Sequence, residues 1–119
     1  MYKIIFYTNK KGISPIENYL QLLSSKKHKN KDCKIRFTKI TAYIDLLSEK
    51  GISIGEPYIK HLEDNIWELR PLRDRILFAY LDNNKFILLH YFMKDTQKTP
   101  RKEIVKAKLN LMDYINRSG

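Results

Sequence analysis

The sequence has little cysteine, little negative charge and no long apolar run. Cys33 is the single cysteine, so an internal disulfide is excluded, and we expect its side chain to be a small buried group on a helix. No run of about 18 apolar residues is present, which argues against a membrane span. The apolar run at residues 2–7 is too short for a signal peptide. We therefore expect a cytoplasmic protein.

The scarcity of acidic residues leaves the chain strongly basic. It contains 13 Asp and Glu residues against 23 Lys and Arg residues, for a formal net charge of +10. This excess favours a polyanionic partner such as nucleic acid, or an acidic protein; the alternative is a basic surface that binds nothing. A length of 119 residues fits one domain over residues 1–119 with a modest core.

The first half of the chain predicts a strand followed by a helical hairpin. Residues 2–7 are β-branched and aromatic, which favours a strand. The segment Ser14-Pro15-Ile16-Glu17 combines an N-cap serine, a proline at the first helical position and a glutamate at the third. A second helix is expected after a polar joint at residues 24–32, and it ends near Lys50 with Gly51 as its C-terminal cap. Each helix has an apolar face, so we expect the two to pack together.

The second half predicts closely spaced strands and a final helix. Strands are expected at residues 66–70, 75–81 and 85–92, and their short connections make them antiparallel neighbours. A shorter strand is expected near residues 58–62. Thr99-Pro100 supplies an N-cap and a first residue for the last helix. The expected stripe of that helix is Ile104, Lys108, Leu111 and Ile115, with Val105, Leu109 and Met112 beside it. The fold class is therefore α+β: a small antiparallel sheet, with an N-terminal helical hairpin and a C-terminal helix mainly on one face.

The register between the last two strands decides which polar side chains meet on the free face. A two-residue turn at residues 83–84 pairs Arg75 with Phe92. That register also turns His90 to the same face, because directly opposed side chains share a face. A three-residue loop instead pairs Arg75 with Tyr91 and turns His90 away. Asparagine tolerates positive φ and favours the two-residue turn. The alternative for His90 is a packed, hydrogen-bonded residue.

Positive charge gathers where the last strand meets the last helix, in FMKDTQKTPRKE at residues 92–103. Lys94 and Lys98 follow the strand, and Arg101 and Lys102 stand in the first helical turn. Cations are unfavourable there against the helix dipole. We expect an external anion, such as a phosphate, to relieve their repulsion and to bind the free helix N–H groups.

A bound ribonucleotide phosphate carries its own nucleophile, the 2′-hydroxyl. Its attack needs a base, cations for the crowded phosphorane and an acid for the leaving oxygen. Arginine stabilises such charge through two hydrogen bonds, and a lysine among other cations transfers protons. This chemistry requires no metal and no cofactor. We also predict no metal site, because the three histidines are far apart in the sequence without ligand spacing.

Three segments of the C-terminal half resemble a known family: IWELR (66–70), DRILFAYL (74–81) and FILLHYFMKDTQKTPRKEIVKA (86–107). They are similar in order and content to the HigB-type, phage Gp49-like branch of the RelE toxin superfamily. The resemblance implies a RelE-like fold and a small toxin that enters the ribosomal A site and cuts mRNA there. It also implies neutralisation by a cognate HigA-like helix-turn-helix antitoxin, as a heterotetramer.

The resemblance also matches particular positions. Arg75 corresponds to a strand arginine that contacts the scissile phosphate, and Lys94 and Lys98 correspond to a basic loop. With the chemistry above, the predicted catalytic residues are Arg73, Arg75, His90, Lys94 and Lys98. The predicted RNA-binding residues are Lys60, Arg70, Phe92 and Arg101.

Several alternatives stay open at this point. Arg70 pairs with Glu68 or Glu63 if it has only a structural role. The basic run at residues 26–39 is either a solvated helix face or a second nucleic-acid contact. The chain as a whole is either an enzyme, a non-catalytic RNA- or ribosome-binding module, or a ParE-like toxin that acts on DNA gyrase.

Overall fold

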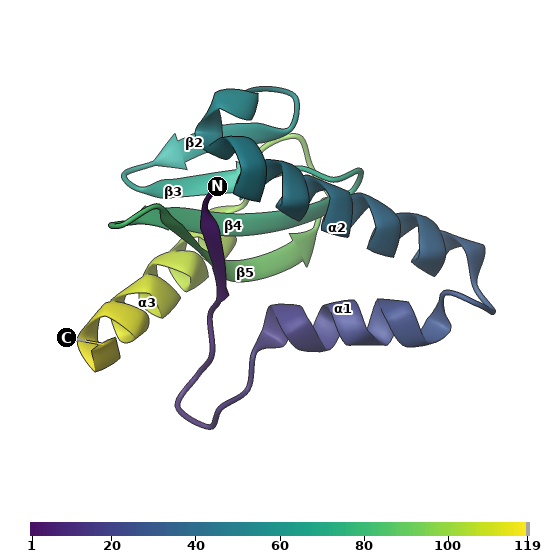
Figure 1. The fold of residues 1–119 in the computed structure, drawn as a ribbon, viewed down its shortest axis with the longest axis horizontal. Helices are drawn as coiled ribbons and strands as arrows, with labels where there is room; N and C mark the ends of the chain where they lie inside the picture. Colours follow the sequence, from purple (N-terminus) through teal and green to yellow (C-terminus); the bar gives the residue numbers. More distant parts are fainter. Residues whose placement is uncertain (119) are drawn as a thin grey trace.

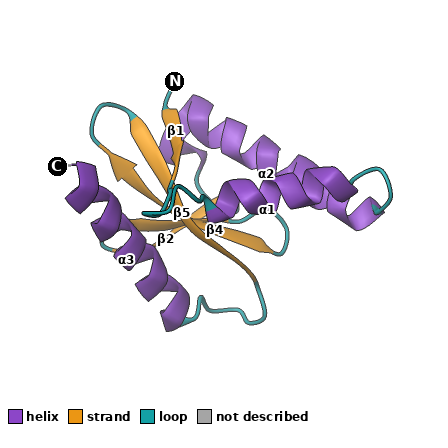
Figure 2. Cartoon of the chain, turned by 90° about the horizontal axis from the view of Figure 1, so that it is seen from below, coloured by secondary structure: helices purple, strands orange, loops and turns teal. Residues whose placement is uncertain are grey.

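A five-stranded sheet lies between a helical hairpin and a single C-terminal helix in the computed structural model, which describes residues 1–118 (Figures 1 and 2). The helices are α1 (Pro15–Lys26), α2 (Lys31–Lys50), the short 3₁₀ helix η1 (Gly51–Ile54) and α3 (Arg101–Ser118). The strands are β1 (Lys3–Phe6), β2 (Ile59–Glu63), β3 (Ile66–Leu69), β4 (Asp74–Leu81) and β5 (Lys85–Met93). The predicted α+β fold is confirmed. Within residues 1–118, no helix has the length and apolarity needed to cross a membrane.

The sheet is mixed rather than purely antiparallel. Its strand order is β1-β5-β4-β3-β2. Strands β2 to β5 are antiparallel neighbours, as expected, whereas β1 runs parallel to β5 at the other edge. The helical hairpin and strands β2 to β4 together form the long connection that this parallel pair needs.

The hairpin begins and ends where its capping residues predict. The Ser14 hydroxyl accepts a hydrogen bond from the Glu17 N–H (3.3 Å). The polar joint is shorter than expected and covers only residues 27–30, because the Asn30 side chain already caps α2. Gly51 ends α2 at φ +63°, and a Cβ there would lie 2.8 Å from the Tyr2 ring. Glycine is therefore the residue that this close approach allows.

The apolar faces of α1 and α2 pack on one face of the sheet, as predicted. The buried hairpin residues are Ile16, Leu23, Cys33, Ile40, Ile44 and Leu47. They form one cluster with sheet residues such as Phe78 and Phe86. The expectation that Cys33 is a buried helix residue is confirmed.

Helix α3 packs on the opposite face, so the expectation of helices mainly on one face is wrong (Figure 2). Ala107 of α3 belongs to a second buried cluster with Leu77, Ala79, Ile87 and Leu89. Strands β4 and β5 are apolar on both faces, and an open second face would leave these side chains in water. What remains uncovered is the corner beyond the start of α3, over β2 and β3.

The rotation of α3 about its axis also differs from the expectation. The sequence pattern suggested one apolar stripe that included Lys108 and Ile115. Ile115 is instead 52% exposed, and Lys108 forms ion pairs with acidic residues. Leu109 and Met112 point outward, with exposed fractions of 59% and 58%. The residues that face the sheet are Ile104, Ala107, Leu111 and Tyr114.

The register of β4 and β5 combines features of both alternatives. The connection is a three-residue loop at residues 82–84, and two of its asparagines have φ of 63° and 57°. The predicted two-residue turn is therefore wrong. A bulge at Leu89, which has no partner in β4, shifts the register by one residue. From Leu77 back to Asp74 the pairing is therefore the one that a two-residue turn would have given. Beyond this bulge, Arg75 lies opposite Phe92 and shares its face with His90, so the predicted pairs are confirmed.

Candidate functional site

Polar side chains form two cross-strand rows on the sheet face that α3 partly covers. Lys60 lies opposite Glu68, and Glu68 lies opposite Leu77. Leu77 in turn lies opposite His90, which completes a row across four strands. A second row lies two residues further along each strand. It contains Arg75 opposite Phe92 and Arg70, which follows β3 and whose N–H donates to the Tyr58 carbonyl oxygen. Together the two rows bring five of the predicted residues to one face: Lys60, Arg70, Arg75, His90 and Phe92.

An open pocket of about 950 Å³, the corner pocket, lies where these rows meet the segment before α3. Residues from β2, from β3 with the residue that follows it, and from the segment 96–101 form its walls. The predicted residues that line it are Lys60, Arg70, Lys98 and Arg101. The predicted residues outside its lining are Arg73, Arg75, His90, Phe92 and Lys94.

Glu68 forms the floor of the corner pocket. Its side chain is 3% exposed and accepts a hydrogen bond from the Thr99 hydroxyl (2.6 Å). Arg70 Nε lies 3.5 Å and Arg75 Nε 3.9 Å from Glu68 Oε1. The pairing of Arg70 with Glu68, one of the open alternatives, is therefore present. One buried carboxylate organises two arginines and holds the loop before α3.

Thr99 does not play its predicted part as the N-cap of α3. Its hydroxyl donates to Glu68, and the helix begins at Arg101. The Pro100 carbonyl accepts from the Glu103 N–H (3.1 Å) and so closes the first turn. The threonine thus tethers the loop to the sheet, which local sequence could not indicate.

Arg75 lies beneath the pocket rather than in its wall. The side chain of this residue is nearly buried, and its Nη1 donates to the carbonyl oxygens of Leu72 (2.6 Å) and Asp74 (2.9 Å). Burial lowers the pKa of its guanidinium, and the nearby charge of Arg70 lowers it further, while Glu68 raises it. The two carbonyl contacts fix the shape of the β3–β4 turn.

The cations around the pocket differ in how far they are already neutralised. Arg101 pairs with Glu63, which also binds Lys108, and these two hydrogen bonds lower the pKa of Glu63 to about 2. Part of the repulsion that an external anion was expected to relieve is thus already relieved at Arg101 by Glu63. Lys60 and Lys98 are exposed and form no ion pair within residues 1–118. They are the pocket cations available to a ligand.

Arg73 and Lys94 lie together beside the pocket. The Lys94 N–H donates to the Arg73 carbonyl (2.8 Å), and Arg73 Nη2 donates to the Lys94 carbonyl (3.3 Å). This pair ties the β3–β4 turn to the end of β5.

His90 is packed and hydrogen-bonded. Its Nε2 lies 2.8 Å from Glu103 Oε1, with both side chains mostly buried. Its ring stacks beside Phe92, with 6.2 Å between ring centroids. The packed alternative for His90 thus describes its present environment. Glu103 orients the His90 ring. From the sequence, only the place of Glu103 near the start of the last helix could be predicted.

Asp74 is an organising residue that the sequence reasoning missed. It is the first residue of β4, and although it is charged, its side chain is only 1% exposed. Arg36 of α2 donates to both of its carboxylate oxygens (3.0 and 3.1 Å), and the Tyr19 hydroxyl of α1 donates to one of them (2.7 Å). Burial and the neighbouring carboxylate raise the pKa of Tyr19. The only available signal was a charged residue directly before an apolar run.

The arrangement can bind an anion, and it contains side chains of the types that move protons. Cationic groups from β2, the end of β3 and the loop before α3 surround the pocket. Within residues 1–118, no three histidine, cysteine, aspartate or glutamate side chains are grouped to hold a metal ion. The side chains nearby that can transfer protons are those of the lysines and of His90.

Comparison with known proteins identifies the family. The model of the family described as Phage derived protein Gp49-like (DUF891) matches residues 26–112. The match covers α2, strands β2 to β5 and the first two thirds of α3, and it includes every predicted site residue. Comparison with curated proteins finds no match. The chain therefore belongs to the Gp49-like family, the family of HigB-type toxins of the RelE superfamily.

Proposed function

We propose that this chain is the toxin of a type II toxin–antitoxin system and that it cuts mRNA in the ribosomal A site. Family membership indicates a toxin-like module paired with an antitoxin. The proposal adds a ribosome-dependent, metal-independent endoribonuclease activity in the cytoplasm and a HigA-like partner in a heterotetramer. The observation that carries it is the convergence of Lys60, Arg70 and Lys98 on one open pocket.

The proposed reaction is an in-line attack of the ribose 2′-oxygen on the adjacent phosphorus. The bond from phosphorus to the 5′-oxygen breaks, the 2′-hydroxyl proton goes to a base, and an acid protonates the leaving oxygen. Lys60 and Lys98 would stabilise the phosphorane and transfer these protons. What supports this is that both line the pocket and neither is paired with a carboxylate within residues 1–118. Arg70 adds a second, planar donor group.

The other predicted residues surround this centre. Arg73 and Lys94 would hold the RNA backbone at the edge of the sheet. Arg101 would bind phosphate by exchanging Glu63 for it, and Phe92 would stack on a base. His90, oriented by Glu103, is a secondary candidate for proton transfer.

Arg75 enters the proposal as a positioning residue that also offsets the charge of Glu68. Its guanidinium lies 3.9 Å from that carboxylate and is anchored by backbone carbonyls. We expect Arg75→Ala to abolish growth arrest and cleavage while antitoxin binding persists. Arg75→Lys should restore part of the activity, since it returns the charge without the planar fork. Full toxicity of Arg75→Ala would remove this residue from the mechanism.

The central test maps the 5′ ends of transcripts after the chain is induced in cells. Wild-type chain should give cuts within translated codons at the A site. Lys98→Ala should lower the cutting rate about 100-fold or more, as expected for loss of a proton-transfer group. Lys106→Ala is the matched control, because Lys106 is an exposed lysine of α3 outside the pocket lining.

The same experiment separates the rival functions. Translation arrest with intact mRNA would indicate a non-catalytic RNA- or ribosome-binding module. DNA damage without mRNA cuts would indicate a ParE-like toxin that acts on gyrase. Either result would refute the endoribonuclease proposal while leaving the family assignment in place.

A further inference from the structure

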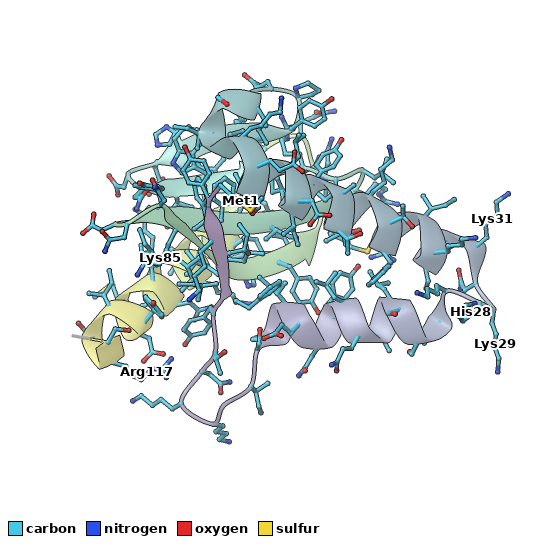
Figure 3. The ribbon with its side chains drawn as sticks, in the orientation of Figure 1. Met1, His28, Lys29, Lys31, Lys85 and Arg117 are labelled. Carbon is cyan, nitrogen blue, oxygen red and sulfur yellow. The ribbon has the colours of Figure 1, made fainter. Side chains whose placement is uncertain are left out.

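We infer that the tip of the helical hairpin is a second RNA-binding surface, which holds the phosphate backbone of an RNA double helix independently of the corner pocket. The hairpin tip is defined as the end of α1, the joint and the first turns of α2, residues 26–39. Lys29 and Lys31 project into solvent from the end of the hairpin (Figure 3).

The hairpin tip carries the largest uncompensated charge in the described chain. Residues 26–39 contain seven Lys or Arg residues and one acidic residue. Only Arg36 among these cations forms an ion pair within residues 1–118, with Asp32 and Asp74. At the corner pocket, by contrast, Glu63 and Glu68 already neutralise two arginines. The attraction between an external polyanion and the lysines of the hairpin tip is therefore not reduced by nearby carboxylates, as it is at the corner pocket.

The side-chain chemistry of the hairpin tip fits phosphate rather than bases. Residues 20–36 contain no Phe, Tyr or Trp, and His28 is the single ring in this stretch, so the hairpin tip offers little of the stacking on which single-strand binding depends. Phe37 is half-buried, and Lys27 Nζ covers it at 5.1 Å from the ring centroid. Lysines act as point charges that contact phosphates without reading sequence.

The composition of the joint also argues against an acidic protein as the partner. Cys33 is the single apolar residue between positions 26 and 34, and it is buried. Protein interfaces normally centre on several exposed apolar or aromatic anchors. The hairpin tip offers one exposed large apolar side chain, that of Ile35 at 43%. A hollow of about 680 Å³ lies beside it, lined by four lysines together with His28, Asn30, Thr38 and the half-buried Phe37. This shape and charge suit a backbone of regularly spaced phosphates.

The two surfaces divide the work if the proposed function holds. The corner pocket would take the single-stranded message, and the hairpin tip would rest on helical RNA such as that of the ribosome. Binding at the hairpin tip requires no cleavage, so the two proposals can fail separately.

The test compares two triple variants with the same change in formal charge, from +10 to +7. The tip variant is Lys29→Gln, Lys31→Gln and Lys34→Gln. The control is Lys3→Gln, Lys11→Gln and Lys50→Gln, which are exposed lysines elsewhere. Each full-length chain is titrated with a blunt RNA duplex of about 16 base pairs and with one of its strands, over a series of salt concentrations. Thermal unfolding by circular dichroism checks that all the variants fold.

We expect the tip variant to lose at least about tenfold in duplex affinity at 0.1 M salt, and its salt slope to fall by about two to three. The control should keep most of its affinity, and the single strand should be affected less than the duplex. An equal loss in both variants would mean diffuse attraction and would overturn the inference. Unchanged duplex affinity in the tip variant, with binding of polyglutamate lost, would identify an acidic-protein surface instead.

Discussion

Two carboxylates decide which cations of the corner pocket are free. Glu68 is buried beside Arg70 and Arg75, and Glu63 is bound to Arg101. Lys60 and Lys98 have no such partner among residues 1–118. At the residue scale, the functional question is therefore which charges are uncompensated, rather than how many there are.

The Glu63 ion pairs predict a pH dependence of stability in the acid range. Hydrogen bonds from Arg101 and Lys108 lower the pKa of Glu63 to about 2 from an ordinary value of 4.5. A lowered carboxyl pKa contributes stability above pH 4.5, which is lost as the pH falls toward 2. The difference in the free energy of unfolding between wild type and Glu63→Gln should therefore shrink over that interval in urea titrations.

Salt provides the control for this prediction. The ion pair is at the surface, so added salt should weaken it and reduce the difference between the two proteins. A difference that stays constant from pH 6 to pH 2 would show that Glu63 acts through packing and not through its charge.

At the scale of elements, a buried ion pair joins the hairpin to the sheet. Arg36 of α2 and Tyr19 of α1 meet Asp74 at the start of β4, and Tyr19 stacks on Tyr91 of β5 with 4.2 Å between centroids. The same β4 start leads directly into Arg75. The position of the hairpin and the shape of the β3–β4 turn are thus coupled through one carboxylate.

Removing that carboxylate should be costly. Asp74→Ala leaves Arg36 without its main partner in a largely buried place, and we expect a loss of about 3 kcal/mol in the free energy of unfolding. The measurement is urea unfolding. The double variant with Arg36→Met should cost less than the sum of the two single changes. An additive result would mean that the two side chains do not interact in solution.

At the scale of the whole molecule, the second face of the sheet is shared between α3 and the corner pocket. Helix α3 crosses the sheet face opposite the hairpin (Figure 2) and covers the apolar middle of β4 and β5. The polar rows extend past its start, where residues such as Lys60 and Glu68 line the corner pocket. The protein thereby buries its core on both faces and still leaves one cationic corner open. The molecule thus has three layers, which are the hairpin, the sheet and α3, and the corner pocket lies where the sheet meets the start of α3.

The seating of α3 can be tested with a matched pair of leucines. Leu111 packs on the second cluster, whereas Leu109 is 59% exposed. We expect Leu111→Ala to lower the free energy of unfolding by about 2 kcal/mol. Leu109→Ala should change it by less than about 0.5 kcal/mol. The reverse order in chemical unfolding would mean that α3 is rotated from the position described.

Local sequence determined the parts of this protein that depend on nearby residues. Ser14 and Gly51 set the ends of the hairpin because capping involves atoms only a few residues apart. Period and spacing predicted the apolar faces of α1 and α2 and the antiparallel strands β2 to β5. The three motifs of the C-terminal half predicted the family that the match over residues 26–112 then established.

Tertiary structure alone decided the features that depend on distant residues. The bulge at Leu89 restored a register that the loop length by itself would have shifted. Thr99 left its expected cap for Glu68, 31 positions away, and Arg36 found Asp74 across 38 positions. Whether a charge is neutralised or free depends on which side chains packing brings together, and neither periodicity nor composition contains that information.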